Sequence, residues 1–96
     1  MAGSGDLGNL VKQAQKRQRE RDLARQEISE MTVEGAAGGS AARVVVDGDG
    51  TVKAVHLSEE ALGSGDKSAL EDLVLAALQN AQTRAAQVKR ERLSKV

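Results

Sequence analysis

The chain of 96 residues contains no cysteine, no proline, and no phenylalanine, tyrosine or tryptophan. The absence of cysteine excludes disulfides and thiolate metal ligands. Aromatic side chains bury roughly 150–250 Å² each, so a chain of this length without them forms a thin core. Small domains with thin cores usually add disulfides, a metal or a second subunit. The composition therefore favours self-association.

Long apolar runs are also missing. No segment approaches the roughly 20 apolar residues of a membrane-spanning helix. The first ten residues, MAGSGDLGNL, lack the basic start and apolar stretch of a signal peptide. We therefore expect a single soluble, cytoplasmic domain over residues 1–96.

Charged residues are plentiful and are sorted by position. The formal net charge is zero, yet residues 12–25 and 84–95 each carry +4 while residues 27–72 carry −7. Two cationic ends around an acidic middle favour a protein that binds a polyanion and keeps its body away from it. The candidate contact residues are Lys12, Lys16, Arg17, Arg19, Arg21 and Arg25 in the first cluster, and Arg84, Lys89, Arg90, Arg92 and Lys95 in the second.

Ten glycines leave two long stretches uninterrupted, at 9–34 and 66–96. Both are rich in residues with high helix propensity, and no proline breaks either one. We predict a flexible N-terminus at 1–8, a helical arm over 9–31 and a C-terminal helix over 66–96. At about 1.5 Å per residue each helix could extend on the order of 40 Å, so parts of both are expected to project from the domain.

The region 32–57 has the pattern of short strands. We predict three antiparallel strands near 32–34, 43–46 and 51–57, the last two joined by a hairpin turn at the Asp-Gly-Asp-Gly sequence of 47–50. Residues 58–62 fit one capped helical turn, and Asp66 or Ser68 could cap the last helix. The predicted fold is α+β, in the order helix, three strands, helix.

An apolar stripe at heptad spacing follows the first helix, and cations interrupt it. It includes positions 7, 10, 14, 24, 28 and 31, with Arg17 and Arg21 in the middle. Arg84, Arg92 and Lys95 similarly share the apolar face of the last helix. A buried cation is costly, so these segments are expected to lie beyond the packed body or at its edge. We expect a homodimer whose interface includes the apolar parts of the sheet and the first helix.

Few residues of the sequence indicate metal binding, phosphate binding or catalysis. Asp47, Asp49 and Thr51 match the start of a calcium loop, but Val52 stands at the required glycine position and Ser58 at the terminal acid position. The glycine-rich run 35–39 lacks a phosphate-loop pattern, and its small residues favour a close approach of strand and helix. His56, the single histidine, is expected on the surface or at an edge. We predict no enzyme activity, no metal or other cofactor and no small-molecule substrate.

The chain resembles the YbaB/EbfC family of bacterial nucleoid-associated proteins over nearly its full length. The resemblance is carried by NLVKQAQK at 9–16, TVEGAAGG at 32–39, VVVDG at 44–48, VKAV at 52–55 and LEDLVLAALQNA at 70–81. It implies a small homodimer shaped like tweezers, with helical arms around a central sheet, that binds DNA in the nucleoid. The chain departs from the family at Arg17 and Arg21, where methionine is common, and at 62–66, where a lysine or a proline-containing turn is common.

Double-stranded DNA is the predicted partner, because without aromatic residues the protein cannot stack on unpaired bases. The predicted role is to organise or regulate the bacterial chromosome. One alternative is a protein-interaction module whose basic helices dock on an acidic partner. A peripheral membrane binder is disfavoured, because the helices lack aromatic anchors and bulky apolar faces.

Overall fold

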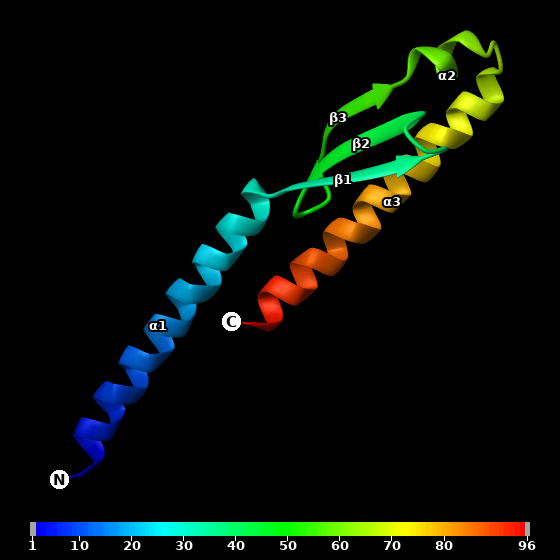
Figure 1. The fold of residues 1–96 in the computed structure, drawn as a ribbon. Helices are drawn as coiled ribbons and strands as arrows, with labels where there is room; N and C mark the ends of the chain where they lie inside the picture. The colour runs from blue at the N-terminus through cyan, green and yellow to red at the C-terminus, as the bar shows by residue number, and fades with distance from the viewer. Residues whose placement is uncertain (1, 96) are drawn as a thin grey trace.

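The computed structural model describes residues 2–95, with side chains from residue 6 onward, and forms a long, narrow molecule (Figure 1). Its extents are 79 × 16 × 15 Å and its radius of gyration is 20.9 Å, whereas a compact domain of this length would have a radius of about 12 Å. The elements, in chain order, are α1 (Ala2–Glu30), β1 (Thr32–Ala37), β2 (Ala42–Asp47), β3 (Val52–Leu57), α2 (Glu59–Gly63) and α3 (Lys67–Ser94). The predicted α+β order of helix, three strands and helix is confirmed.

The three strands form one antiparallel sheet in the order β1-β2-β3. Val33 pairs with Val46 and Gly35 with Val44, and the pairing of β2 with β3 is shifted by an irregularity between Val45 and Val46. The helix α3 runs along one face of the sheet and packs on β1 and β2 (Figure 1). The body is therefore a two-layer structure, from which α1 leads away.

The core lies between α3 and the sheet, and it is thin. Alternate residues of the strands face α3. In α3, three alanines spaced four residues apart lie on one face of the helix and pack against the strands. The large side chains that are fully buried are Ile28, Val44 and Val46. The buried residues of the core between α3 and the sheet are Val33, Ala42, Val44, Val46, Ala77, Ala81 and Ala85.

Gly35 allows the backbone of β1 to approach α3 closely. A Cβ atom at this position would lie 2.2 Å from the nitrogen and 2.5 Å from the Cα of Ala81. Beside it, the amide of Ala36 donates a hydrogen bond of 3.1 Å to Oδ1 of Asn80. The predicted close approach of strand and helix is thus confirmed.

The hairpin turn between β2 and β3 is stabilised by the buried Asp47. Its Oδ1 accepts hydrogen bonds from the amides of Asp49 at 2.9 Å and Thr51 at 3.0 Å. The hydrogen bond from Thr51 is the largest cause that lowers the pKa of Asp47 below its ordinary value of 3.8. This carboxylate therefore stabilises the turn between β2 and β3.

Among residues 2–95 no group of three or more potential metal ligands is found.

The same turn anchors the end of α1. The amide of Gly48 donates a hydrogen bond of 3.0 Å to the carbonyl of Ile28. A Cβ atom at Gly48 would lie 2.1 Å from that carbonyl oxygen, so glycine is required here for steric reasons. The side chain of Ile28 is fully buried, and α1 is therefore fixed to the body at its C-terminal end.

Two of the helices begin at capping residues that the sequence analysis names. Ser58 caps α2 and Asp66 caps α3, each accepting a hydrogen bond from an amide three residues later. The sequence predicts an arm from residue 9, and in the structure α1 begins at Ala2. Glycine lowers helix stability without forbidding helical dihedral angles, and the glycines at 3, 5 and 8 do not end the helix. The predicted ends at residues 1 and 96 lie outside the described residues.

We predict that Gly35→Ala lowers the free energy of unfolding by about 3 kcal/mol, because the new methyl group would overlap backbone atoms that have no rotamer to escape into. For a domain of this size each kcal/mol lowers the melting temperature by roughly 4–8 °C. Thermal unfolding followed by circular dichroism measures the change. The matched control is Gly63→Ala, since a Cβ there meets no atom within 4 Å. Equal stability of the two variants would contradict the prediction.

Candidate nucleic-acid interface

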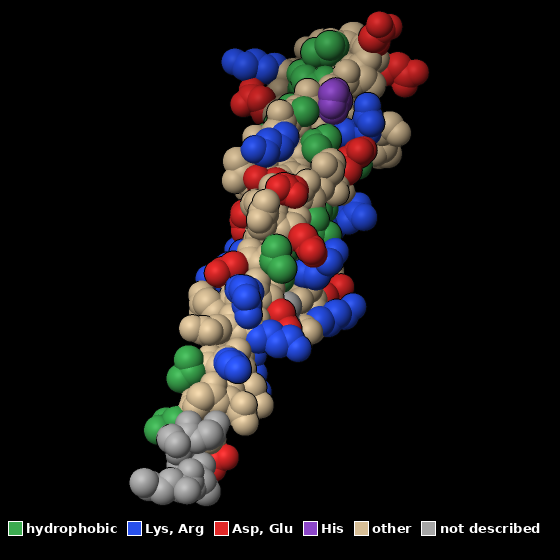
Figure 2. All heavy atoms as spheres, turned by 90° about the vertical axis from the view of Figure 1, so that its left-hand side faces the viewer, with side chains coloured by type: hydrophobic (Ala, Val, Ile, Leu, Met, Phe, Trp, Pro, Cys, Tyr) green, Lys and Arg blue, Asp and Glu red, His purple; other side chains and the backbone are tan. Residues whose placement is uncertain are grey.

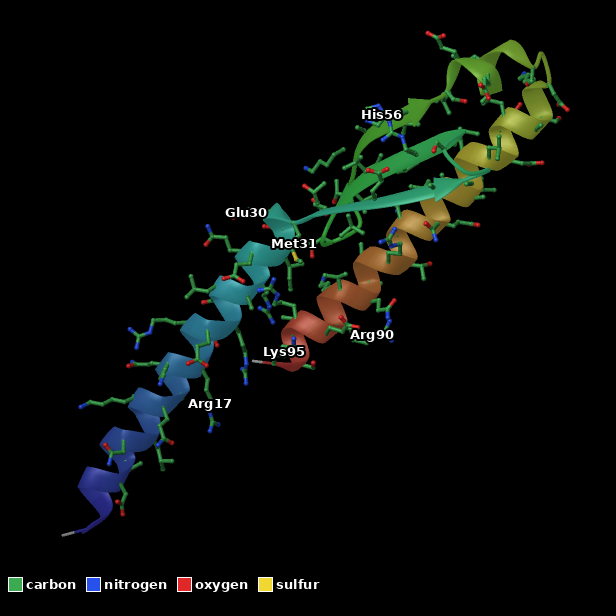
Figure 3. The ribbon with its side chains drawn as sticks, viewed as in Figure 1. Arg17, Glu30, Met31, His56, Arg90 and Lys95 are labelled. Atoms are coloured by element: carbon green, nitrogen blue, oxygen red, sulfur yellow. The ribbon has the colours of Figure 1, made fainter. Side chains whose placement is uncertain are left out.

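The N-terminal part of α1 is a cationic arm that projects from the body. Every side chain from residue 6 to Leu23 is exposed, and the first buried side chain of α1 is that of Ala24. Figure 3 shows Arg17 on the stretch of α1 that extends past the end of α3. The arginines of the apolar stripe therefore lie beyond the packed body, as the cost of burying a cation predicts.

None of the six cations of α1 forms a salt bridge within the part of the chain that the structure describes. They occupy two opposite sides of the helix, since residues in an α-helix are 100° apart. One side carries Lys12, Lys16 and Arg19, and the other carries Arg17, Arg21 and Arg25. The arm thus presents positive charge in two directions to the solvent.

The cations of α3 are divided between the fold and the solvent. Three of them have partners within the chain. Arg84 donates a hydrogen bond of 2.7 Å to the carbonyl of Glu34, and Lys89 forms a 2.9 Å salt bridge with Asp49. Arg92 forms a 2.8 Å salt bridge with Glu27 of α1. Arg90 and Lys95 have no salt bridge among residues 2–95.

Each of the three cations of α3 that have partners, Arg84, Lys89 and Arg92, connects α3 to another element. Arg84, together with Asn80, satisfies backbone groups of β1 on the edge of the sheet that pairs with no other strand. Lys89 reaches the hairpin turn, and Arg92 reaches α1. Their side chains run along the edge of the packed body, so the predicted edge location of Arg84 and Arg92 is confirmed. The spacing in the sequence places Arg84 and Arg92 on one face of the last helix, but it does not predict which groups they contact.

Charge is separated along the molecule. Figure 2 shows Lys and Arg side chains gathered around the region where α1 meets the end of α3. The opposite end, formed by α2 and the start of α3, carries five acids and one lysine: Glu59, Glu60, Asp66, Lys67, Glu71 and Asp72. A polyanion is therefore attracted to the arm and repelled from the far end.

The remaining polar candidate, His56, lies on the face of the sheet that α3 does not cover. It is exposed and pairs in register with Arg43, and Figure 3 shows it on β3, far from the arm. Its predicted surface location is confirmed. Arg43 in turn contacts Glu34 at 3.5 Å, so this face is locally balanced in charge.

The architecture is thus a two-layer α+β body, in the order helix, three strands and helix, from which a basic helix projects. Residues 3–96 match the YbaB/EbfC DNA-binding family, and the chain belongs to this family. It is 39% identical over 92 residues to a nucleoid-associated protein of Acetivibrio thermocellus, covering 96% of this chain and 81% of that protein. It is 35% identical over 94 residues to a nucleoid-associated protein of Saccharopolyspora erythraea, covering 98% and 81%.

Within residues 2–95, none of the helices is sufficiently long and apolar to cross a bilayer.

We predict that Arg84→Met lowers the free energy of unfolding by about 1 kcal/mol, because the carbonyl of Glu34 loses a charged hydrogen-bond donor. Methionine retains an unbranched apolar stem, which limits the change to the guanidinium. Arg90→Met is the control and should unfold like the parent, since Arg90 has no salt bridge among the described residues. Urea titration measures both variants. If Arg84→Met were as stable as the parent, the role assigned to Arg84 would be wrong.

Proposed function

We propose that this protein binds double-stranded DNA as a nucleoid-associated protein in the bacterial cytoplasm, and that it organises or regulates the chromosome. The observation that carries the proposal is the exposed arm of α1, whose six cations have no salt-bridge partners among residues 2–95. Membership of a DNA-binding family and the names of the two relatives support it.

The shape of the arm suits a groove of duplex DNA. An α-helix with its side chains is about 10–12 Å across, and the major groove is about 12 Å wide and bordered on both sides by phosphates. A helix with cations on two opposite sides can contact both borders at once. Phosphate contacts of this kind strengthen and position binding, whereas contacts with base edges would add sequence preference.

The eleven cations predicted from the sequence divide into two groups in this proposal. The direct contacts are those of the arm together with Arg90 and Lys95 at the end of α3. The engaged residues Arg84, Lys89 and Arg92 must give up an internal partner before they can bind phosphate. Exposed ion pairs contribute only about 0.2–1 kcal/mol, so Lys89 and Arg92 can exchange partners at little cost.

We further propose that the protein is a homodimer joined through an apolar surface that α3 leaves uncovered. Val52 and Val55 are in register with the buried Val46 and Val44, yet they are 42% and 47% exposed because α3 lies over β1 and β2. The adjoining flank of α3 continues this surface as a groove lined by Leu57, Leu70, Glu71, Val74, Leu75 and Leu78.

This surface suits a two-fold interface, in which the same patch of each subunit covers the other. The sequence predicts that the first helix also takes part. In the structure Ala24 and Ile28 of its apolar stripe are already buried within the subunit, and Arg17 interrupts the stripe beyond them. The proposed interface is therefore centred on β3 and α3, which leaves the two arms free to point outward.

We predict that light scattering at micromolar concentration yields about twice the chain mass of 10.1 kDa, and that Val55→Lys yields the monomer mass. The lysine would place a charge in the proposed apolar contact. His56→Lys is the control, since His56 is next in the strand and faces the opposite side of the sheet. A parent protein that is monomeric at this concentration would contradict the dimer proposal.

We predict that the affinity for random duplex DNA falls steeply with salt, because each neutralised phosphate releases counterions with a slope of about −0.9 in the logarithmic plot. Gel retardation over a salt series with several unrelated duplexes measures this slope and any sequence preference. Binding to duplex DNA that stays constant from low to moderate salt would show that the cationic arm is not the contact surface.

We predict that the double variant Arg17→Met, Arg21→Met binds DNA more weakly and with a shallower salt slope, by roughly one unit for each phosphate that is no longer neutralised. Both arginines are exposed on the free arm, so the fold should be unaffected or slightly more stable. The matched control replaces both residues with lysine, which keeps the charge and removes the planar two-bond fork. Full binding by the lysine variant would show that charge alone matters, and parental binding by the methionine variant would remove these residues from the site.

A further inference from the structure

The arm of α1 is attached to the body near its C-terminal end. The carbonyl of Ile28 accepts hydrogen bonds from the amides of Gly48 at 3.0 Å and Met31 at 3.1 Å, and the side chain of Ile28 is fully buried. Among residues 6–30 the other buried side chain is that of Ala24, one turn earlier on the same face of the helix. These contacts fix the point at which α1 is attached more firmly than the direction in which its exposed part points.

One ion pair joins α1 to α3 beside this attachment. Nη1 of Arg92 lies 2.8 Å from Oε2 of Glu27, and the other three salt bridges among residues 2–95 lie outside α1. Figure 3 shows Arg90 and Lys95 on the same end of α3, and Arg17 on the arm. The pair of Glu27 and Arg92 therefore lies between the two groups of cations that the proposed function assigns to DNA.

The direction of the arm matters because the arm is long. Lys12 stands fifteen residues before Glu27, which is about 22 Å along a helix. A tilt of about 10° at the attachment would move Lys12 by about 4 Å, close to the rise of about 3.4 Å per nucleotide along one strand of duplex DNA. A small change in direction is thus enough to move the cations of the arm out of register with the phosphates.

Arg92 gains little by leaving Glu27 for a phosphate. The two side chains are 43% and 57% exposed, so water weakens their attraction and Arg92 is able to exchange its partner. The exchange would leave the carboxylate of Glu27 unpaired beside the same phosphates, and its repulsion of them would offset the new contact. Arg92 therefore contributes more to binding while it remains with Glu27.

We propose that Glu27 and Arg92 are positioning residues for DNA binding, because their salt bridge sets the angle between the arm of α1 and the end of α3 and persists in the complex. This inference rests on the proposed function. The proposed dimer interface uses α3 between Leu70 and Leu78, so the pair lies at the other end of that helix. Glu27 then strengthens the binding of a polyanion although it carries a negative charge.

The sign of the change in affinity provides the test. Glu27→Gln removes an acid from a cationic surface, which by charge alone would strengthen binding. Loss of the positioning contact should instead weaken the affinity for a duplex of about 25 base pairs two- to fivefold, the range that corresponds to an exposed ion pair. The matched control is Glu20→Gln, which removes the same charge from α1 at a residue without a salt bridge among residues 2–95. It should bind at least as tightly as the parent.

Two further variants separate positioning from direct contact. Arg92→Gln should weaken binding at least as much as Glu27→Gln and keep the salt slope of the parent, whereas loss of a phosphate contact would make the slope shallower by roughly one unit. The double variant Glu27→Arg, Arg92→Glu exchanges the two charges and re-forms the bridge, so it should restore the parental affinity to within about twofold. Loss of either charge alone would not be rescued in this way if the two residues acted independently.

Pulsed electron paramagnetic resonance measures the direction of the arm with and without DNA. The chain contains no cysteine, so spin labels at Gln13→Cys on the arm and His56→Cys on the sheet report one distance when labelled chains are diluted with unlabelled ones. The distance distribution should be narrow in the parent and unchanged on the duplex. It should be broader when Glu27→Gln is added, and narrow again with the exchanged pair.

The outcomes separate this inference from the proposed function. If the parent binds DNA with a steep salt slope but Glu27→Gln binds as tightly as Glu20→Gln, the pair does not position the arm, and the inference is overturned while DNA binding stands. A distance distribution that Glu27→Gln leaves unchanged would overturn it in the same way. If the parent binds no duplex DNA at any salt concentration, the proposed function fails, and this inference fails with it.

Discussion

The contact between the backbone of β1 at Gly35 and the backbone of α3 at Ala81 is the constraint on which the rest of the molecule depends. A core without aromatic rings can be filled only if the layers approach closely, and here a strand glycine lies against Ala77 and Ala81 of the helix. Dispersion contacts fall off steeply with separation, so the close approach compensates for the small size of the side chains. It also fixes the height and direction of α3, and through them the positions of its cations.

Because α3 lies over β1 and β2, the two sides of the body differ. At β1, side chains of α3 satisfy the outer edge of the strand through Asn80 and Arg84. At β3, apolar side chains stay exposed beside a groove along α3. One edge of the sheet is thus closed against further pairing, and the apolar surface of the proposed dimer interface lies on the other side.

The use of positive charge follows the same division. Cations that lie within reach of the body are drawn into holding its parts together, as Lys89 and Arg92 are. Cations that lie beyond the body, on α1, have no salt bridges in the described part of the chain and stay exposed. In the proposed function, basic residues close to the sheet stabilise the fold, whereas basic residues far from the sheet bind the ligand.

The sequence by itself determined the order of the elements, the hairpin turn, the caps at Ser58 and Asp66, and the sorting of charge, because periodicity, turn residues and capping residues act over a few neighbouring positions. It did not determine where α1 begins, because glycines weaken a helix without ending it. Only the tertiary structure decided which cations are engaged, since Arg84 meets Glu34 across fifty residues of chain and Arg92 meets Glu27 across sixty-five. It also decided that α3 covers two strands and leaves β3 open, because the placement of a helix on a sheet follows from how the two surfaces fit together, which no local pattern specifies.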